Sequence, residues 1–67
     1  MITLTVNGKE RTLAETMSVT RFLEESGIDP RIVAVEHNGV ALRREQFPEV
    51  MLGAGDQVEV VRMIGGG

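Results

Sequence analysis

The sequence contains no cysteine, no tryptophan and no tyrosine, and it has one histidine. Without cysteine, the chain cannot form a disulfide, a zinc–thiolate site or a thiol nucleophile. One histidine without cysteines also makes no cluster of metal ligands. These absences exclude disulfide scaffolds, zinc domains and thiol-dependent enzymes, and a small chain without disulfides is typical of the reducing cytoplasm.

Excess positive charge and long apolar runs are also missing. Seven Lys and Arg residues against ten Asp and Glu residues give a net charge of −3, which argues against a nucleic-acid-binding surface. No apolar run approaches the ~20 residues of a membrane span, and the first residues lack the pattern of a signal peptide. We therefore expect an acidic, soluble, cytoplasmic protein that binds neither nucleic acid nor a membrane.

Length and composition predict one small domain. A domain of about 67 residues buries only ~60% of the surface of its unfolded chain, which leaves little room for an internal active site. The apolar fraction of 42% is nevertheless sufficient for a folded core. We expect residues 1–64 to form this domain, residues 65–67 to be a flexible tail, and the protein to be a monomer.

The first 13 residues predict a β-hairpin. Ile2, Leu4 and Val6 alternate with threonines, the period of a half-buried strand. Asn7-Gly8 favours a type I′ turn, in which both residues have positive φ. Residues 9–13 are then the returning strand.

Residues 18–27 predict a short helix. Ser18 can cap its N-terminus, and Met17 and Phe22 have the spacing of a hydrophobic staple. Gly27 is expected in the left-handed conformation at the C-terminus, and Pro30 prevents continuation. About two turns of helix depend on packing against a sheet for their stability.

The second half of the chain predicts further strands and turns. We expect a strand over residues 32–37, an Asn-Gly turn, a short return strand over 40–42, an irregular or 3₁₀ segment over 43–50, a turn over 52–56 and a last strand over 57–63. The resulting order β-β-α-β-(short β)-β predicts an α+β fold, a mixed sheet of four or five strands with one helix across it.

Few residues suggest chemistry within the domain. His37 has no evident nucleophile or orienting partner, so we interpret it as a solvated residue at a strand end. Gly53 and Gly55 precede a strand instead of a helix, and we therefore interpret them as a plain turn and not as a phosphate loop. Arg43 and Arg44 are interpreted as solvated charges.

The last strand is apolar on both sides. Side chains alternate along a strand, so Val58 and Val60 are expected on one face and Val61 and Met63 on the other. Either the strand is buried on both faces, or an apolar strip stays exposed beside the tail. In the second case Val61, Met63 and the adjacent Ile64 predict a docking surface.

The chain ends in Gly65-Gly66-Gly67. Three residues without Cβ atoms restrict the backbone less than any others, and they form a thread that can enter a narrow channel in another protein. If the tail is native, the chemistry takes place at the carboxylate of Gly67 and other proteins perform it. The alternative interpretation is a disordered end or an expression scar.

Taken together, these segments resemble the thiazole-biosynthesis sulfur carrier family, ThiS, which has the ubiquitin-like β-grasp fold. The resemblance covers essentially the whole chain. It rests on the ordered set Asn7-Gly8, Ser18-Val19-x-x-Phe22-Leu23, Val33-Ala34-Val35-Glu36, Asn38-Gly39, Arg44-Glu45-Gln46-Phe47, Leu52-x-x-Gly55-Asp56 and Ile64-Gly65-Gly66-Gly67. Phe47 stands where another aromatic such as Trp is also familiar.

The resemblance implies a carrier that does not itself catalyse and binds no cofactor. In this family, an E1-like adenylyltransferase uses ATP and Mg to convert the terminal carboxylate, here that of Gly67, into an acyl adenylate. Sulfur from a persulfide donor then displaces AMP, and thiazole synthase receives the sulfur from the resulting thiocarboxylate.

Several alternatives remain open at this stage. The small subunit of molybdopterin synthase and the carriers that supply sulfur to other metabolites share the fold and the tail. A ubiquitin-like modifier joined to target lysines through Gly67 also begins with adenylation. A plain interaction domain with an artificial tail is the third class.

Overall fold

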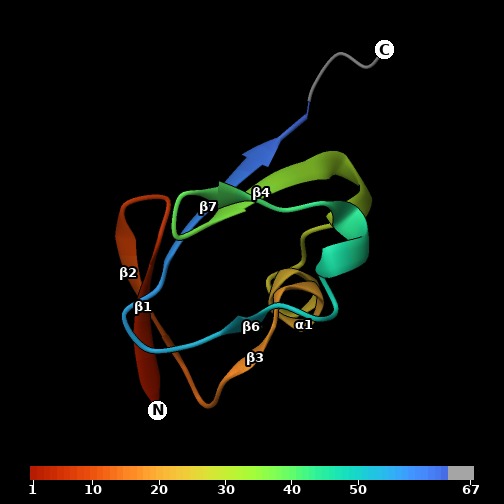
Figure 1. Cartoon of the computed structure of the whole chain (residues 1–67). Coiled ribbons are helices and arrows are strands. Elements are labelled where there is room, and N and C mark those ends of the chain that lie inside the picture. Colours follow the sequence, from red (N-terminus) through yellow and green to blue (C-terminus); the bar gives the residue numbers. More distant parts are fainter. Residues whose placement is uncertain (64–67) are drawn as a thin grey trace.

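The computed structural model, which describes residues 1–63, consists of a mixed sheet with one α-helix across one face (Figure 1). The sheet order is β2-β1-β7-β4-β5. The predicted α+β fold with five strands and one main helix is confirmed. These elements are β1 Ile2–Val6, β2 Lys9–Leu13, α1 Val19–Glu25, β4 Val33–His37, β5 Val40–Ala41 and β7 Gln57–Arg62.

A second, two-stranded sheet was not predicted. β3 (Met17–Ser18) pairs with β6 (Met51–Leu52) in antiparallel fashion beside the helix. The turn predicted over residues 52–56 was therefore wrong at Leu52, which is a fully buried strand residue. Two residues carry no readable periodicity, so only the tertiary pairing identifies these strands.

Two 3₁₀ turns connect the larger elements. One, η2 (Arg44–Gln46), confirms the 3₁₀ turn predicted in the segment 43–50. The other, η1 (Pro30–Ile32), was not predicted and takes Ile32 out of the strand that follows. Proline at the first position of this turn has its φ set in advance and lacks an N–H that would need a partner.

Both Asn-Gly dipeptides form the predicted hairpin turns. Asn7 and Asn38 each have φ of 52°, and the glycines that follow have φ of 79° and 85°. Positive φ at both central positions is the type I′ geometry, whose twist matches that of the flanking strands. The turns set the register of each hairpin, which pairs Val6 with Lys9 and His37 with Val40.

The first N–H groups of the helix α1 find hydrogen-bond acceptors in the N-cap residue and in a loop distant in the sequence. The Ser18 hydroxyl accepts from the Arg21 N–H at 3.1 Å, as predicted for an N-cap. The N–H groups of Val19 and Thr20 donate to the carbonyls of Val50 and Phe47 at 3.0 and 3.2 Å. Because the first N–H groups of a helix have no partners within it, the loop after η2 is held against the helix start.

The helix C-terminus has the predicted Schellman geometry. Gly27 has φ of 75°, and the Ile28 N–H donates to the Leu23 carbonyl at 2.8 Å. This bond reverses the chain and brings Ile28 back towards the helix. The helix therefore ends where the sequence indicates.

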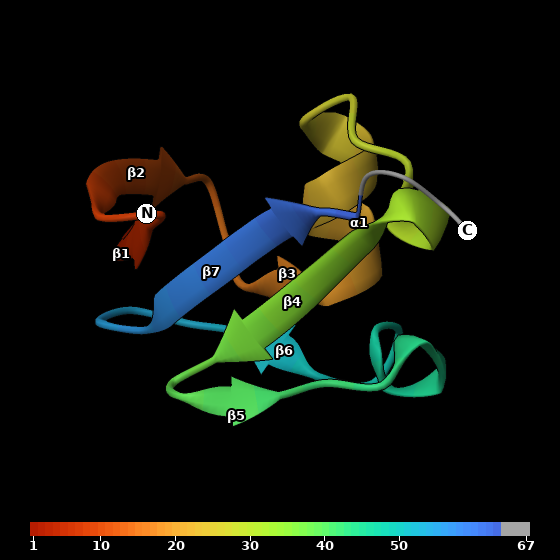
Figure 2. The ribbon, with the colours of Figure 1, turned by 90° about the horizontal axis from the view of Figure 1, so that it is seen from above.

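The hydrophobic core lies between the helix and the sheet. Phe22 and Leu23 of the helix pack into it, and Val58 of β7 is only 1% exposed. Figure 2 shows β7 and β4 running antiparallel side by side, with the helix on one side of them. The buried residues are Leu4, Leu13, Met17, Val19, Phe22, Leu23, Val33, Val35, Phe47, Leu52 and Val58.

His37 is not the solvated residue that the sequence suggested. Its Nε2 lies 2.8 Å from Oδ2 of Asp56, and the two side chains are only 21% and 19% exposed. The same Asp56 oxygen accepts from the Gly53 N–H at 2.8 Å, and the Asn38 amide donates to Oδ1 at 3.3 Å. Through these contacts Asp56 links the β4–β5 turn to the loop that precedes β7.

These contacts shift the pKa of Asp56. Burial raises the pKa of this carboxyl, but hydrogen bonds from His37, the Gly53 N–H and Asn38 outweigh burial, and the pKa lies below its usual 3.8. A carboxyl with a lowered folded pKa adds stability above its unfolded pKa, and that stability is lost as the pH falls through the folded value.

We predict that Asp56→Asn lowers the free energy of unfolding at pH 6–7 and that the difference from the natural protein shrinks below about pH 4. Urea denaturation at a series of pH values measures it. Asn can still accept from the Gly53 N–H but carries no charge, so the variant isolates the ionised carboxylate. A difference that stays constant down to about pH 2 would contradict the assigned role.

None of the helices within residues 1–63 is long and apolar enough to cross a bilayer.

Candidate functional site

The last described strand, β7, is the middle strand of the sheet. It pairs with β1 in parallel, with Val6 opposite Val58, and with β4 in antiparallel fashion, with Val33 opposite Arg62. Beyond the strand, the Met63 N–H donates to the Ile32 carbonyl at 2.7 Å. The backbone is therefore held by hydrogen bonds up to the residue before Ile64.

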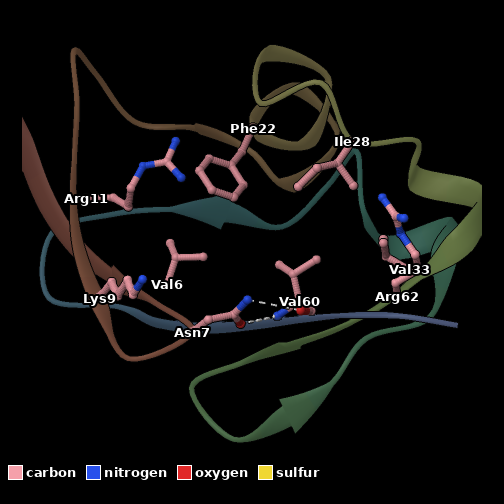
Figure 3. A pocket seen from close by; sticks show the side chains of 9 residues that line it. All are labelled: Val6, Asn7, Lys9, Arg11, Phe22, Ile28, Val33, Val60 and Arg62. Carbon is pink, nitrogen blue, oxygen red and sulfur yellow. Dashed lines mark hydrogen bonds between the residues drawn. The ribbon is translucent and has the colours of Figure 1, made fainter.

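Asn7 extends the pairing of β7 past the end of β1. Its backbone N–H donates to the Val58 carbonyl at 2.9 Å. Its side-chain amide donates to the Val60 carbonyl at 3.1 Å and accepts from the Val60 N–H at 2.8 Å, as drawn in Figure 3. The amide group thus takes the place of another strand residue, because it supplies one donor and one acceptor.

Asn38 binds the same strand at its start. Its backbone N–H donates to the Gln57 carbonyl at 2.7 Å, and its side-chain oxygen accepts from the Gln57 N–H at 2.8 Å. Both turn asparagines therefore bind β7, Asn38 at its first residue and Asn7 in its middle. Sequence reasoning treated them only as turn formers. The available signal was the choice of Asn in both turns, since Gly or Asp also satisfies a type I′ turn.

The two faces of β7 differ sharply in exposure. Val58 is buried and Val60 half-buried against the core, whereas Val61 and Met63 are 59% and 54% exposed. The predicted alternation is confirmed. Of the two interpretations left open, the structure shows the exposed strip and excludes burial on both faces.

This apolar strip continues onto the neighbouring strand. Ala34 of β4 is exposed and lies opposite Val61 in the register. Glu36 and Glu59, also opposite each other and exposed, follow on the same face. We call Ala34, Val61 and Met63 the apolar strip. It is a small apolar surface with two carboxylates on one side, and it lies at the end of β7 from which the C-terminal residues follow.

Four of the predicted site residues lie outside the described residues: Ile64, Gly65, Gly66 and Gly67. The proposed boundary between a domain of residues 1–64 and a tail of residues 65–67 also stays a prediction. Val61 and Met63 are the predicted site residues that the structure brings together on one face.

The side chains of residues 1–63 form no cluster of metal ligands. No group of three or more His, Cys, Asp or Glu side chains that could hold a metal ion lies within them, and no polar or charged residue in this range is buried. Arg43 and Arg44 are exposed, as predicted. What the described site can do is present one anchored strand, with an apolar surface, to another molecule.

The sheet order, the single helix across one face and the central C-terminal strand define a ubiquitin-like β-grasp protein. A family model described as the ThiS family matches residues 4–67, and the chain belongs to the ThiS family. The predicted resemblance is confirmed.

Solved structures and a curated relative agree with this assignment. The crystal structure of the thiamine biosynthesis protein ThiS from Geobacter metallireducens superposes with a TM-score of 0.87 at 40% identity, over 98% of this chain and 100% of that chain. The solution structure of a thiamine biosynthesis protein from the same organism gives a TM-score of 0.81 at 40% identity, over 98% and 88% of the chains. A protein of Paramagnetospirillum magneticum named thiazole synthase is 41% identical over 64 residues.

The match to that thiazole synthase covers 96% of this chain but only 20% of the relative. The chain therefore spans about a fifth of the length of the curated relative that it matches.

We predict that Asn7→Gly lowers the free energy of unfolding by about 1–3 kcal/mol, because it removes two hydrogen bonds worth roughly 0.5–1.5 kcal/mol each while keeping the positive φ. Amide hydrogen exchange should speed up at Val60, whose N–H loses its acceptor. The Val61 N–H, which by alternation faces β4, should change less and serves as the internal control. Equal protection of the Val60 N–H in both proteins would show that the hydrogen bonds from the Asn7 side chain do not stabilise β7.

Proposed function

We propose that this protein carries sulfur for the synthesis of the thiazole ring of thiamine, as a thiocarboxylate on Gly67. The observation that carries the proposal is the ThiS family match, which includes the described fold and reaches Gly67. The exposed apolar strip supports it, because a carrier needs a surface by which partner enzymes recognise it. The protein acts as a co-substrate and not as a catalyst.

Activation of the carboxylate is the first chemical step of the proposal. A terminal carboxylate has a pKa of about 3.3–3.7, is ionised at neutral pH and is a poor electrophile. An E1-like adenylyltransferase transfers AMP from ATP, with Mg, to the carboxylate of Gly67 and releases pyrophosphate. The acyl adenylate has a good leaving group.

Sulfur transfer is the second step. The outer sulfur of a persulfide donor attacks the Gly67 carbonyl carbon and AMP leaves, so that a carbon–sulfur bond replaces the carbon–oxygen bond. A thiol supplies the two electrons that cleave the remaining sulfur–sulfur bond and release the thiocarboxylate. This chain has no cysteine, so the persulfide and the thiol both belong to partners.

Thiazole synthase is the proposed acceptor. The relative named thiazole synthase contains, within one longer chain, a segment similar to this protein. A shared chain places carrier and acceptor at high effective concentration, which supports a direct encounter between the corresponding proteins here. Because the chain lacks cysteine, we further propose that these encounters take place in the reducing cytoplasm.

We predict that deleting Gly67 abolishes sulfur loading and that Gly66→Val nearly does so, because a branched side chain blocks a narrow channel. The measurement is intact mass spectrometry after incubation with ATP, a persulfide source and the candidate adenylyltransferase. In the natural protein the mass should rise by the replacement of one oxygen by sulfur, mapped to the terminal peptide. Circular dichroism should show unchanged folding of both variants.

Other outcomes separate the alternatives. Normal loading of either variant would overturn the mechanism. Higher-mass conjugates of Gly67 with lysines of other proteins would identify a modifier. A loaded carrier that supplies a molybdopterin synthase large subunit and not thiazole synthase would assign the sulfur to another product.

We predict that Val61→Asp raises the KM of the adenylyltransferase for this protein about tenfold or more, because docking would bury an unpaired carboxylate. The rate at saturation should change little, since the tail is intact. Val40→Asp is the matched control: Val40 is 62% exposed but lies on the edge strand β5, outside the apolar strip. Equal effects of the two variants would remove the strip from the docking surface.

A further inference from the structure

A pocket of about 390 Å³ lies at the end of the domain that carries the β1–β2 turn, between the sheet and the helix (Figure 3). Phe22 and Ile28 line it from the side of the helix, and Val60 lines it from β7. Three cationic residues, Lys9, Arg11 and Arg62, also line it, together with Val6, Asn7 and Val33. The pocket is thus an apolar hollow with three cationic side chains.

Two exposed cationic residues occupy positions of β2 on the side of the strand that faces the core. Along β2, alternation puts Lys9 and Arg11 on the same face as Leu13, and Leu13 is only 8% exposed in the core. Positions that face a core are ordinarily apolar. In β2, two of the three core-facing positions carry a charge, and the Arg11 guanidinium lies 5.4 Å from the centre of the Phe22 ring.

Among the residues that the structure describes, no acidic side chain lines the pocket. The lining contains three of the seven Lys and Arg residues and none of the ten Asp and Glu residues. Within residues 1–63, the salt bridges of arginines are made by Arg21 and Arg31, which lie elsewhere. In a protein of net charge −3, this pocket is a local concentration of positive charge.

The pocket and the apolar strip are on opposite faces of the same strand end. Val60 and Arg62 line the pocket, whereas Val61 and Met63 form part of the strip on the other face. A partner that binds this end of β7 can contact both faces of the strand. One partner can therefore cover both the pocket and the apolar strip.

We propose that this pocket receives an acidic segment of a partner protein, with an aromatic or large aliphatic side chain on the apolar floor and Asp or Glu residues beside Lys9, Arg11 and Arg62. The identity of the partner, an enzyme that acts on the C-terminus, rests on the proposed function. The ligand chemistry rests only on the pocket.

A protein segment fits the pocket better than a small molecule does. Small-molecule sites enclose about 70–90% of the ligand surface, whereas here all three cationic residues are exposed at the rim. A partner that covers the rim excludes water and strengthens the ion pairs, which are weak while solvated. A rim of this kind therefore favours a segment that belongs to a larger surface.

The test uses three synthetic peptides and the ¹⁵N-labelled full chain. The probe is acetyl-Asp-Glu-Phe-Asp-Glu-amide. One control peptide replaces the carboxylates by amides (Asn-Gln-Phe-Asn-Gln), and the other replaces Phe by Ser. We expect the acidic Phe peptide to shift the amide signals of Arg11, Phe22 and Val60, and both controls to bind more weakly.

Charge-removing variants provide the second measurement. Lys9→Gln and Arg62→Gln should each lower the affinity for the acidic Phe peptide about two- to fivefold, which is the effect of one exposed ion pair. Arg43→Gln, which removes an exposed charge outside the pocket, should leave the affinity unchanged. Higher salt should weaken binding of the acidic peptide, because exposed charges are screened.

Three outcomes would overturn the proposal. Equal binding of the amide peptide would deny the role of the cations. Tighter binding of phenyl phosphate at the same signals would identify a small-anion site. Absence of any shift would mean that the cations only cover the apolar floor with their aliphatic stems. The titration needs no sulfur loading, so its failure is distinguishable from failure of the proposed carrier chemistry.

Discussion

Backbone pairing of β7 is the constraint on which the rest of the structure depends. The strand has hydrogen-bonding neighbours on both sides, and the amides of Asn7 and Asn38 bind it where its neighbours turn away. β7 is the middle strand of the five-stranded sheet and the last of its strands along the chain. The two halves of the sheet, β2-β1 and β4-β5, are therefore joined only after β7 has paired with both. Folding of the whole domain is thus coupled to the position of the chain just before its C-terminal residues.

This arrangement is consistent with the proposed carrier role, in which partner enzymes would recognise the end of β7. Hydrogen bonds hold β7 up to Met63, so the residues that follow start from a defined point. One face of the strand end offers the apolar strip, and the other borders the cationic pocket. The same short stretch can therefore present two chemically different surfaces to a partner.

Features that depend on near neighbours in the chain were predicted correctly. The Asn-Gly turns, the Ser18 cap and the Gly27 reversal each involve residues a few positions apart, where local sterics and hydrogen bonding decide the conformation. The prediction for His37 was wrong, because its partner Asp56 is distant in the sequence and no local pattern indicates their contact. β3 and β6 were missed for the same reason.

By itself, the sequence determined the fold class, the hairpins, the helix and the alternation of β7, because periodicity and turn chemistry are local properties. It also carried the ordered set of segments that assigns the chain to the ThiS family. Only the tertiary structure decided that Val61 and Met63 are exposed. It also decided that Asn7 and Asn38 hydrogen-bond to β7 and that Lys9, Arg11 and Arg62 line one pocket. The exposure of a side chain, and the meeting of side chains from distant segments at one pocket, depend on which strands lie side by side. That order is set by packing of the whole chain around its core.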